Sequence, residues 1–451
     1  MTKKIYPGKL SGTISAPLSK SSAQRLLICS RLAHSAEKKT KNFGTGCVVL
    51  PDKDLLSEDI KSLISCLNEP VNEAETVFHC GESGANLRFL MPVAASGIVP
   101  ARRITFTGGG RLPERPVGEL AAVMKEHGVT FDFSAAPVGK SLPFTLSGKL
   151  TPGRYELSGD ISSQYITGLL FALPLLGDGS EIVLTAPLQS CPYVEMTLDA
   201  LSMFGVDVVF TEDMRKFSVR GKQRYICPES TASYFGKSGN TGIGIRPEGD
   251  WSGAAFFLAA GAINSHVSVS GLDINSLQGD KRILTILKDF GAKTDWTKTL
   301  PGNGTASISA RGTAPIEIDV SEIPDLAPVL AVVAGADAGA VTNSSPKHVS
   351  TFWGAKRLRL KETDRLETTA ALINSLGGKA EIAGHSLKVT TRKLHGGECE
   401  SFGDHRIAMS AAIAALSCSE PVILKGAEAV NKSYPGFWND FRALGGRWED
   451  V

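Results

Sequence analysis

Apolar segments rich in alanine, leucine and glycine recur along the chain, each after a polar or charged loop. They are apolar on nearly all sides, which predicts buried helices. Their spacing of roughly 60–90 residues exceeds that of solenoid repeats, so each copy is expected to be a supersecondary module. The six copies begin near Lys20, Glu82, Ser162, Asp250, Asp325 and Asp404.

A second, amphipathic helix is expected after each buried one, followed in several copies by a β-type run such as residues 206–210. Most of these helices end just before a glycine, which suits the left-handed cap position. The glycines are Gly128, Gly205, Gly291, Gly377 and Gly445. Six modules form two halves of three, with a junction expected near residues 225–248, where a Gly/Ser-rich stretch breaks the pattern. The pattern predicts an α/β (α+β) fold.

The net charge of +2 gives no global basic field. Because nucleic-acid binding depends on concentrated Lys and Arg with interleaved aromatic side chains, an RNA-binding or polyanion-binding module is disfavoured. The eight cysteines form no C-x-x-C pair and no zinc-ligand spacing with histidine. They are interpreted as reduced thiols of a cytoplasmic protein. No phosphate-binding G-x-x-x-x-G-K-[ST] loop and no signal-peptide or membrane-spanning run is present.

Cations are found at predicted helix starts, where the helix dipole disfavours them. They are Lys20, Arg115, Lys361, Arg406 and Lys432. Stability alone does not explain this placement, but a bound phosphate or carboxylate does, since helix N-termini attract anions. The sequence therefore predicts an enzyme that binds anionic small molecules.

Each residue alone has an ordinary structural explanation. Lys361 and Arg365 could belong to a solvated helix face, with Glu362 and Asp364 as ion-pair partners. Asp325, Asp404 and Ser162–Ser163 could be simple N-caps. The binding interpretation gains weight because all candidates occupy equivalent places in a repeating architecture.

Ten motifs, taken in order, resemble those of the 5-enolpyruvylshikimate-3-phosphate synthase family of enolpyruvyl transferases. They are LSKSSAQR (18–25), GESGANLR (81–88), RLPERPVG (111–118), GDISSQY (159–165), SCPYVEMT (190–197), PEGDWSGAAFF (247–257), IPDLAP (323–328), RLKETDRL (359–366), GDHRIAM (403–409) and NKSYPGF (431–437). The resemblance covers nearly the whole chain. The order of SKSSAQR, KETDRL and GDHRIAM is the most specific part of it.

The resemblance implies two similar domains, each of three βαβαββ units (an inside-out α/β barrel), with the active site in the interdomain cleft. The first domain would span residues 19–245, and the second residues 1–18 and 246–451. The implied reaction transfers the carboxyvinyl group of phosphoenolpyruvate to the 5-hydroxyl of shikimate 3-phosphate and releases phosphate. It implies no metal and no cofactor. We expect small-molecule substrates only, no nucleic acid or membrane partner, and a monomer.

The resemblance also implies roles for individual residues. Shikimate 3-phosphate would be bound by Lys20, Ser21, Arg25, Ser162, Ser163, Gln164, Ser190, Tyr193, Asp325 and Lys361. Phosphoenolpyruvate would be bound by Lys20, Gly84, Arg115, Gln164, Arg365, Arg406 and Lys432. Lys20, Asp325 and Glu362 would be catalytic, with Asp325 as the base for the 5-hydroxyl and Glu362 as the acid that protonates the methylene carbon.

The chain departs from the family pattern at a few positions. Glu82 stands where Asn is usual, Ala85 where Thr is common, and Arg357 where some members have Asn. The segment 36–56 is longer and more irregular than expected. The alternative function is transfer of enolpyruvate to UDP-N-acetylglucosamine. The loop around Arg115 lacks the reactive cysteine of that sister family, which disfavours the alternative.

Overall fold

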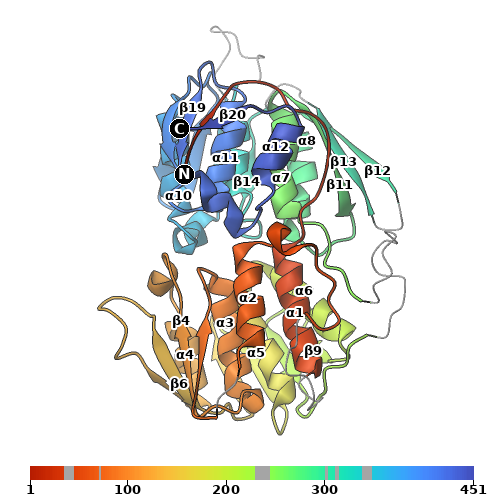
Figure 1. Ribbon diagram of the computed structural model, residues 1–451, viewed down its shortest axis with the longest axis vertical. Coiled ribbons are helices and arrows are strands. Elements are labelled where there is room, and N and C mark those ends of the chain that lie inside the picture. The colour runs from red at the N-terminus through yellow and green to blue at the C-terminus, as the bar shows by residue number, and fades with distance from the viewer. Residues whose placement is uncertain (35–44, 71–72, 229–243, 300–302, 310–313, 338–347) are drawn as a thin grey trace. The chain divides into compact units, whose positions relative to one another are not determined.

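The computed structural model describes residues 1–34, 45–70, 73–228, 244–299, 303–309, 314–337 and 348–451 (Figure 1). Most of the junction predicted at 225–248, and part of the long segment 36–56, therefore lie outside the described residues. The chain divides into two compact units. Unit 1 comprises Met1–Ser19, Asp54–Ser57 and Glu248–Val451, and unit 2 comprises Lys20–Lys53 and Glu58–Pro247.

In its described residues, unit 2 contains two four-stranded sheets, ordered β3-β4-β6-β5 and β7-β8-β10-β9, and six α-helices. Its helices are α1 (Lys20–His34), α2 (Glu58–Asn68), α3 (Gly84–Val93), α4 (Gly118–Glu126), α5 (Ser163–Ala172) and α6 (Cys191–Met203). Its strands are β3 (Glu75–His79), β4 (Arg103–Thr107), β5 (Val129–Asp132), β6 (Phe144–Gly148), β7 (Arg154–Leu157), β8 (Ser180–Leu184), β9 (Val208–Phe210) and β10 (Lys216–Val219).

Unit 1 contains three such sheets, ordered β12-β13-β11-β2, β14-β15-β17-β16 and β18-β19-β1-β20. Its helices are α7 (Trp251–Ile263), α8 (Ile283–Asp289), α9 (Ala327–Gly335), α10 (Arg365–Ser375), α11 (His405–Ala415) and α12 (Phe437–Ala443). Its strands are β1 (Thr2–Ile5), β2 (Ser11–Ser15), β11 (His266–Asp273), β12 (Lys293–Lys298), β13 (Asn303–Ser309), β14 (Glu317–Asp319), β15 (Val349–Trp353), β16 (Lys379–Ala383), β17 (Ser386–Thr390), β18 (Gly397–Glu400), β19 (Val422–Lys425) and β20 (Trp448–Asp450).

All five sheets share one pairing pattern. Two parallel strands lie at one end of each sheet, and the other pairings are antiparallel, as in β3∥β4 followed by β6 and β5. A parallel pair needs a crossover, usually a helix, between its strands. Here the crossover helices are α3, α5, α7, α9 and α11. The mixed α/β class predicted from the sequence is therefore confirmed.

The crossover helices form the cores of the units. Every residue of α7, α9 and α11 is buried, as their all-round apolar sequences predicted. No polar face anchors such helices at a surface, so contacts on all sides hold them and place their N-termini firmly. Among the described residues, no helix is both long and apolar enough to cross a membrane.

Candidate active site

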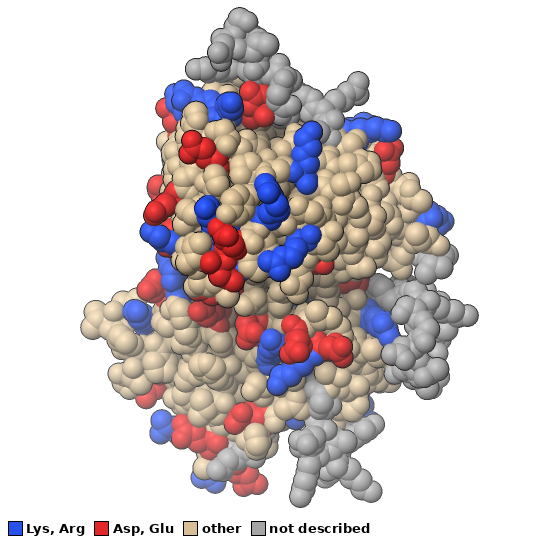
Figure 2. Space-filling view, turned by 45° about the horizontal axis from the view of Figure 1, so that its top comes forward, with Lys and Arg blue, Asp and Glu red and all other residues tan. Residues whose placement is uncertain are grey.

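Charged side chains of both signs lie on one face of the molecule (Figure 2). On the face shown in Figure 2, Lys and Arg alternate with Asp and Glu, and neither sign dominates. Surface ion pairs of this kind contribute little to stability. The concentrated charge lies inside each unit, around side chains that the sequence analysis selected.

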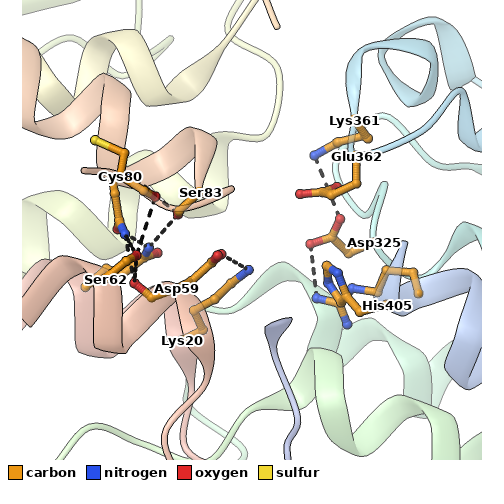
Figure 3. A network of polar contacts seen from close by, with 12 residues as sticks. Lys20, Asp59, Ser62, Cys80, Ser83, Asp325, Lys361, Glu362 and His405 are labelled. Atoms are coloured by element: carbon orange, nitrogen blue, oxygen red, sulfur yellow. Dashed lines mark hydrogen bonds and ion pairs between the residues drawn. The ribbon is translucent and has the colours of Figure 1, made fainter. Parts of the chain in front are cut away.

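Six charged residues form a connected cluster in unit 1, here called the Asp325 network, of which Figure 3 labels Asp325, Lys361 and Glu362. It consists of Asp325, Lys361, Glu362, Arg365, Asp404 and Arg406. The Asp325 carboxylate accepts from Arg365 Nη1 at 2.6 Å and Arg406 Nη2 at 3.3 Å, and Lys361 Nζ lies 3.8 Å away. Arg365 also binds Glu362 Oε2 and Asp404 Oδ2, both at 2.7 Å. Three cations thus face three carboxylates.

Helix ends position this network. Asp404 is the N-cap of α11, where its side chain accepts from the Arg406 backbone N–H at 2.8 Å, and it binds the Arg365 guanidinium at the same time. Arg365 is the first residue of α10, so one carboxylate joins the N-termini of two helices. Thr363 Oγ1 adds a third bond to Asp404, at 3.1 Å. The prediction that Asp404 is an N-cap is confirmed, and Asp404 also binds Arg365.

Two of the ordinary structural explanations are wrong. Asp325 is not an N-cap, since α9 has Leu326 at that place and Asp325 faces cations instead. Lys361 and Arg365 are not a solvated helix face, because their side chains are 20% and 1% exposed. Arg365 does pair with Glu362, as that explanation required, but inside the unit, while Asp364 pairs with Arg359 at the surface.

Burial and neighbouring charges shift the pKa values of this network. Burial would raise the pKa of Asp325, but Arg406, Lys361 and Arg365 hold it well below its usual range. Burial lowers the pKa of Lys361 to about 8, and Arg357 and Arg365 act in the same direction. Asp325 is therefore strongly ionised before any substrate binds, and Lys361 is the cation whose charge is most easily lost.

Arg406 has spare hydrogen-bonding capacity. Its side chain is 4% exposed, and among the described residues its Nε and Nη1 atoms have no hydrogen-bond partner. A buried guanidinium without partners is costly, and carboxylate or phosphate oxygens satisfy it best. This side chain is the part of the network most ready to accept an anion.

Arg406 also interacts electrostatically with a buried carboxylate that sequence reasoning missed. Asp280 is 2% exposed and accepts a hydrogen bond from Ser252, while its Oδ1 has no partner in the described part of the chain. Burial, with a contribution from Asp325, raises the pKa of Asp280 to about 7. Asp280 belongs to the short 3₁₀ segment Gly279–Arg282, and no sequence signal distinguishes it from a solvated acid.

In unit 2, Lys20 begins α1 and its Nζ lies 2.9 Å from Asp59 Oδ2 (Figure 3). Asp59 is almost fully buried on the first turn of α2, and the sequence analysis did not select it. Its position gave a misleading signal, because an acid at a helix start is explained by the helix dipole alone.

Arg25 contacts two of the other predicted residues. Its Nη1 donates to the Ser21 carbonyl and its Nη2 to the Tyr193 carbonyl, both at 2.7 Å. Ser190, the N-cap of α6, lies three residues before Tyr193 in the left-handed backbone region, with φ of 58°. Such strain in a residue other than glycine is often kept at functional sites. Ser21, Arg25, Ser190 and Tyr193 thus converge on the ends of α1 and α6.

Gln164, Ser162, Ser163, Gly84 and Arg115 converge at another place in unit 2. Ser162 caps α5 by accepting from the Gln164 N–H, and Ser163 is the first residue of that helix. Arg88, which sequence reasoning also missed, donates from Nη1 to Gln164 Oε1 at 2.6 Å and from Nη2 to the Pro116 carbonyl at 2.9 Å.

Gly84 is required by this packing. A Cβ there would lie 2.7 Å from Arg115 Cζ, so any side chain would displace that guanidinium. Lys432, in contrast, does not begin a helix as expected: it ends the 3₁₀ segment Ala427–Lys432, and α12 starts at Phe437. Asn-Lys-Ser-Tyr-Pro cannot continue a helix through the proline, which explains the delay.

The comparisons with known proteins agree with this picture. The sequence model described as EPSP synthase (3-phosphoshikimate 1-carboxyvinyltransferase) matches residues 5–441. The chain is 37% identical over 453 residues to a 3-phosphoshikimate 1-carboxyvinyltransferase of Clostridium kluyveri, covering 99% of this chain and 98% of that one. It is 38% identical over 455 residues to the Clostridium acetobutylicum protein of the same description, with 98% and 97% covered.

Solved structures show the same fold. EPSP synthase from Acinetobacter baumannii matches with a TM-score of 0.72 at 22% identity over 100% of both chains. The enolpyruvyl transferase NikO from Streptomyces tendae matches with a TM-score of 0.64 at 13% identity, covering 99% of this chain and 98% of that one. The family match over most of the chain and the full-length relatives establish that this chain belongs to the EPSP synthase (3-phosphoshikimate 1-carboxyvinyltransferase) family.

Proposed function

We propose that this chain performs the reaction of its family, transferring the carboxyvinyl group of phosphoenolpyruvate to the 5-hydroxyl of shikimate 3-phosphate with release of phosphate. This is an enzymatic transfer in the shikimate pathway, which leads to the aromatic amino acids. The observation that carries the proposal is the Asp325 network, with its spare donors on buried Arg406. Two substrates that each bring a phosphate and a carboxylate require cations of this kind.

The binding roles follow the contacts in each unit. Arg406, Arg365, Lys432, Arg115 and Gly84 are proposed for phosphoenolpyruvate, together with Lys20 and Gln164. The residues that converge on Arg25 are proposed for shikimate 3-phosphate, with Ser162, Ser163, Gln164 and Lys361. Arg88 supports this assignment, because it fixes the Gln164 carbonyl oxygen and turns the amide N–H₂ group away from itself, where it can donate.

Asp325 and Glu362 are proposed as the base and the acid. Both are bound to the same Arg365 guanidinium, at 2.6 and 2.7 Å, which holds them close together. A proton taken from a hydroxyl and a proton given to a carbon of the adjoining substrate need two such groups within reach of one centre. Lys20, already charge-paired with Asp59, completes the proposed catalytic set.

The finer architecture and setting are also part of the proposal. Each unit would be a domain of three βαβαββ repeats, and both would contribute residues to the same two substrates. The free state of all eight cysteines accords with a reducing, cytoplasmic setting. A monomer is proposed as the active form.

The test is phosphate release from phosphoenolpyruvate by the full-length chain. We expect release only when shikimate 3-phosphate is present. Release with UDP-N-acetylglucosamine in its place would overturn the assignment in favour of the sister reaction. The assay needs no assumption about individual residues, so it tests the function separately from the site.

A pair of matched variants tests the acid. We expect Glu362→Gln to lower kcat by on the order of 10²-fold or more while the KM values change little. Glu367→Gln makes the same change at a side chain that is 61% exposed and pairs with Arg359, and its kcat should stay near that of the unaltered chain. Equal kcat values for the two variants would remove Glu362 from the acid role.

A further inference from the structure

Two cysteines far apart in the sequence meet in unit 2. The Cys227 thiol donates to Cys47 Sγ at a sulfur–sulfur distance of 2.6 Å, across a separation of 180 residues. Both side chains are half-buried, so small molecules in solvent can reach them. Neither residue has a part in the proposed reaction.

Backbone contacts fix both cysteines. The Cys47 N–H donates to Ser30 Oγ of α1 at 3.0 Å, and the Cys47 carbonyl accepts from the Ile245 N–H at 2.8 Å. On the other side, the Ile226 N–H donates to the Phe204 carbonyl at 2.9 Å, and buried Tyr225 donates to the Phe171 carbonyl at 2.8 Å. The two sulfurs therefore meet because the surrounding structure holds them there.

We propose that Cys47 and Cys227 form a dithiol site that a low-molecular-weight disulfide oxidises to an intramolecular disulfide bond. This inference is independent of the carboxyvinyl transfer. It assigns a modification site at the C-terminal end of α1, beside Ser30 and His34.

The exchange proceeds in two steps. The Cys47 thiolate attacks one sulfur of the small disulfide, the sulfur–sulfur bond of that molecule breaks, and the departing thiolate takes a proton from water. Cys227 then loses its proton to water and attacks Cys47 Sγ, and the second small thiol leaves. Two protein thiols are oxidised by two electrons, and one small disulfide is reduced to two thiols.

The surroundings explain this order. Burial, the hydrogen bond to Cys47 and the charge of Cys47 together raise the pKa of Cys227 to about 12, so Cys227 is a poor first nucleophile. Once Cys47 is a mixed disulfide, its negative charge is gone and only burial opposes ionisation of Cys227. His34 Nδ1 lies 3.7 Å from Cys227 Sγ and 2.8 Å from the Ser30 carbonyl, which can only accept, so the Nδ1 hydrogen is donated to that carbonyl.

Another pair of thiols in unit 2, Cys66 and Cys80, is less exposed to solvent than Cys47 and Cys227. Cys66 helps to raise the pKa of Cys80, but these two thiols are 4% and 0% exposed, and Cys66 donates to the His79 carbonyl. An oxidant that works by direct attack reaches half-buried sulfur sooner than fully buried sulfur. The structure thus separates the proposed pair from the buried one.

The experiment treats the full-length chain with oxidised glutathione, then measures free thiols after denaturation and maps the linked peptides by mass spectrometry. We expect the thiol count to fall by two from eight, with one cross-link between the peptides of Cys47 and Cys227. Cys227→Ser should stop at a single glutathione adduct on Cys47, because the resolving thiol is missing. Cys47→Ser should retain all of its remaining thiols.

Cys418→Ser is the matched control. Its thiol lies in unit 1 and donates to the Ala414 carbonyl, a bond that a serine hydroxyl can also make. This variant should form the same cross-link as the unaltered chain. A thiol count that stays at eight in the unaltered chain, or a cross-link that joins Cys66 to Cys80 instead, would overturn the proposal.

Discussion

Replacement of Asp404 by asparagine tests the Asp325 network. Asp404 is fully buried, caps α11 and binds Arg365 through both carboxylate oxygens, at 2.7 and 3.2 Å. Asparagine has nearly the same shape and is an equally good N-cap, so α11 should keep its start. The substitution therefore removes one negative charge and replaces one accepting oxygen by an N–H₂ donor, which cannot accept from Arg365.

The expected cost follows from the charge balance. With Asp404 neutral, three buried or half-buried cations face only Asp325 and Glu362, and one positive charge lacks compensation. Breaking one partner of a buried ion pair costs about 3–5 kcal/mol. For a unit of this size, that corresponds to a fall of the unfolding midpoint by roughly 6–20 °C. An anion bound to the network should restore part of this loss.

The assay is thermal unfolding, without ligand and with phosphoenolpyruvate plus shikimate 3-phosphate. We expect the midpoint without ligand to fall in Asp404→Asn and the gain on adding both substrates to exceed that of the unaltered chain. Asp364→Asn is the control, because Asp364 also caps a helix and binds an arginine but is 31% exposed, so its cost should stay below about 1 kcal/mol. Equal midpoints for the Asp404 variant and the unaltered chain would refute the reasoning.

Three further predictions use the same contacts. Lys361 has a pKa of about 8, so the KM for shikimate 3-phosphate should rise as the pH increases through that value. In Lys361→Arg this rise in KM should move to higher pH, as measured over roughly pH 7–10. If the rise in KM stayed at the same pH, Lys361 would be excluded as the titrating ligand. Asp280 has a pKa of 3.8 when unfolded and about 7 when folded, so the native state binds more protons and stability falls as pH rises between these values. Asp280→Asn should remove on the order of 4 kcal/mol of the change in the free energy of unfolding over this pH range, as measured by urea unfolding. An unchanged dependence of the free energy of unfolding on pH would contradict this prediction. Arg88→Lys cannot hold Gln164 and the Pro116 carbonyl together, so the KM for phosphoenolpyruvate should rise roughly tenfold with unfolding unchanged; an unchanged KM would show that Gln164 needs no such support.

The sequence was most informative about elements whose composition allows only one location in the fold. Helices α7, α9 and α11 are apolar on nearly all sides, and a helix of that kind is expected to be buried. The pairing of strands was harder to predict from the sequence. Strand β1, near the N-terminus, completes the sheet of β19 and β20 near the C-terminus. A short alternating strand carries no signal that selects a partner more than 400 residues away, so such contacts are set by the folded units.

The candidate site shows the same limit. Lys361, Arg365 and Arg406 could be selected because cations near helix starts conflict with the helix dipole. Asp59 and Asp280 could not, because an acid at a helix start satisfies that dipole and appears ordinary in the sequence. Sequence reasoning therefore found the groups that oppose local stability and missed the carboxylates that compensate them inside the fold.

This compensation bears on how Asp325 can act as the proposed base. In the structure, Arg406, Lys361 and Arg365 keep the pKa of Asp325 well below its usual range, so it would take a proton poorly. The same cations are the proposed anion ligands, and a phosphate or carboxylate bound to Arg406 and Lys361 would compete with Asp325 for them. Arg365 would stay in place, because Asp404 and Glu362 hold it as well. Bound substrate would therefore raise the proton affinity of Asp325 when Asp325 has to act as a base. The N-termini of α10 and α11 would remain joined through Asp404 and Arg365.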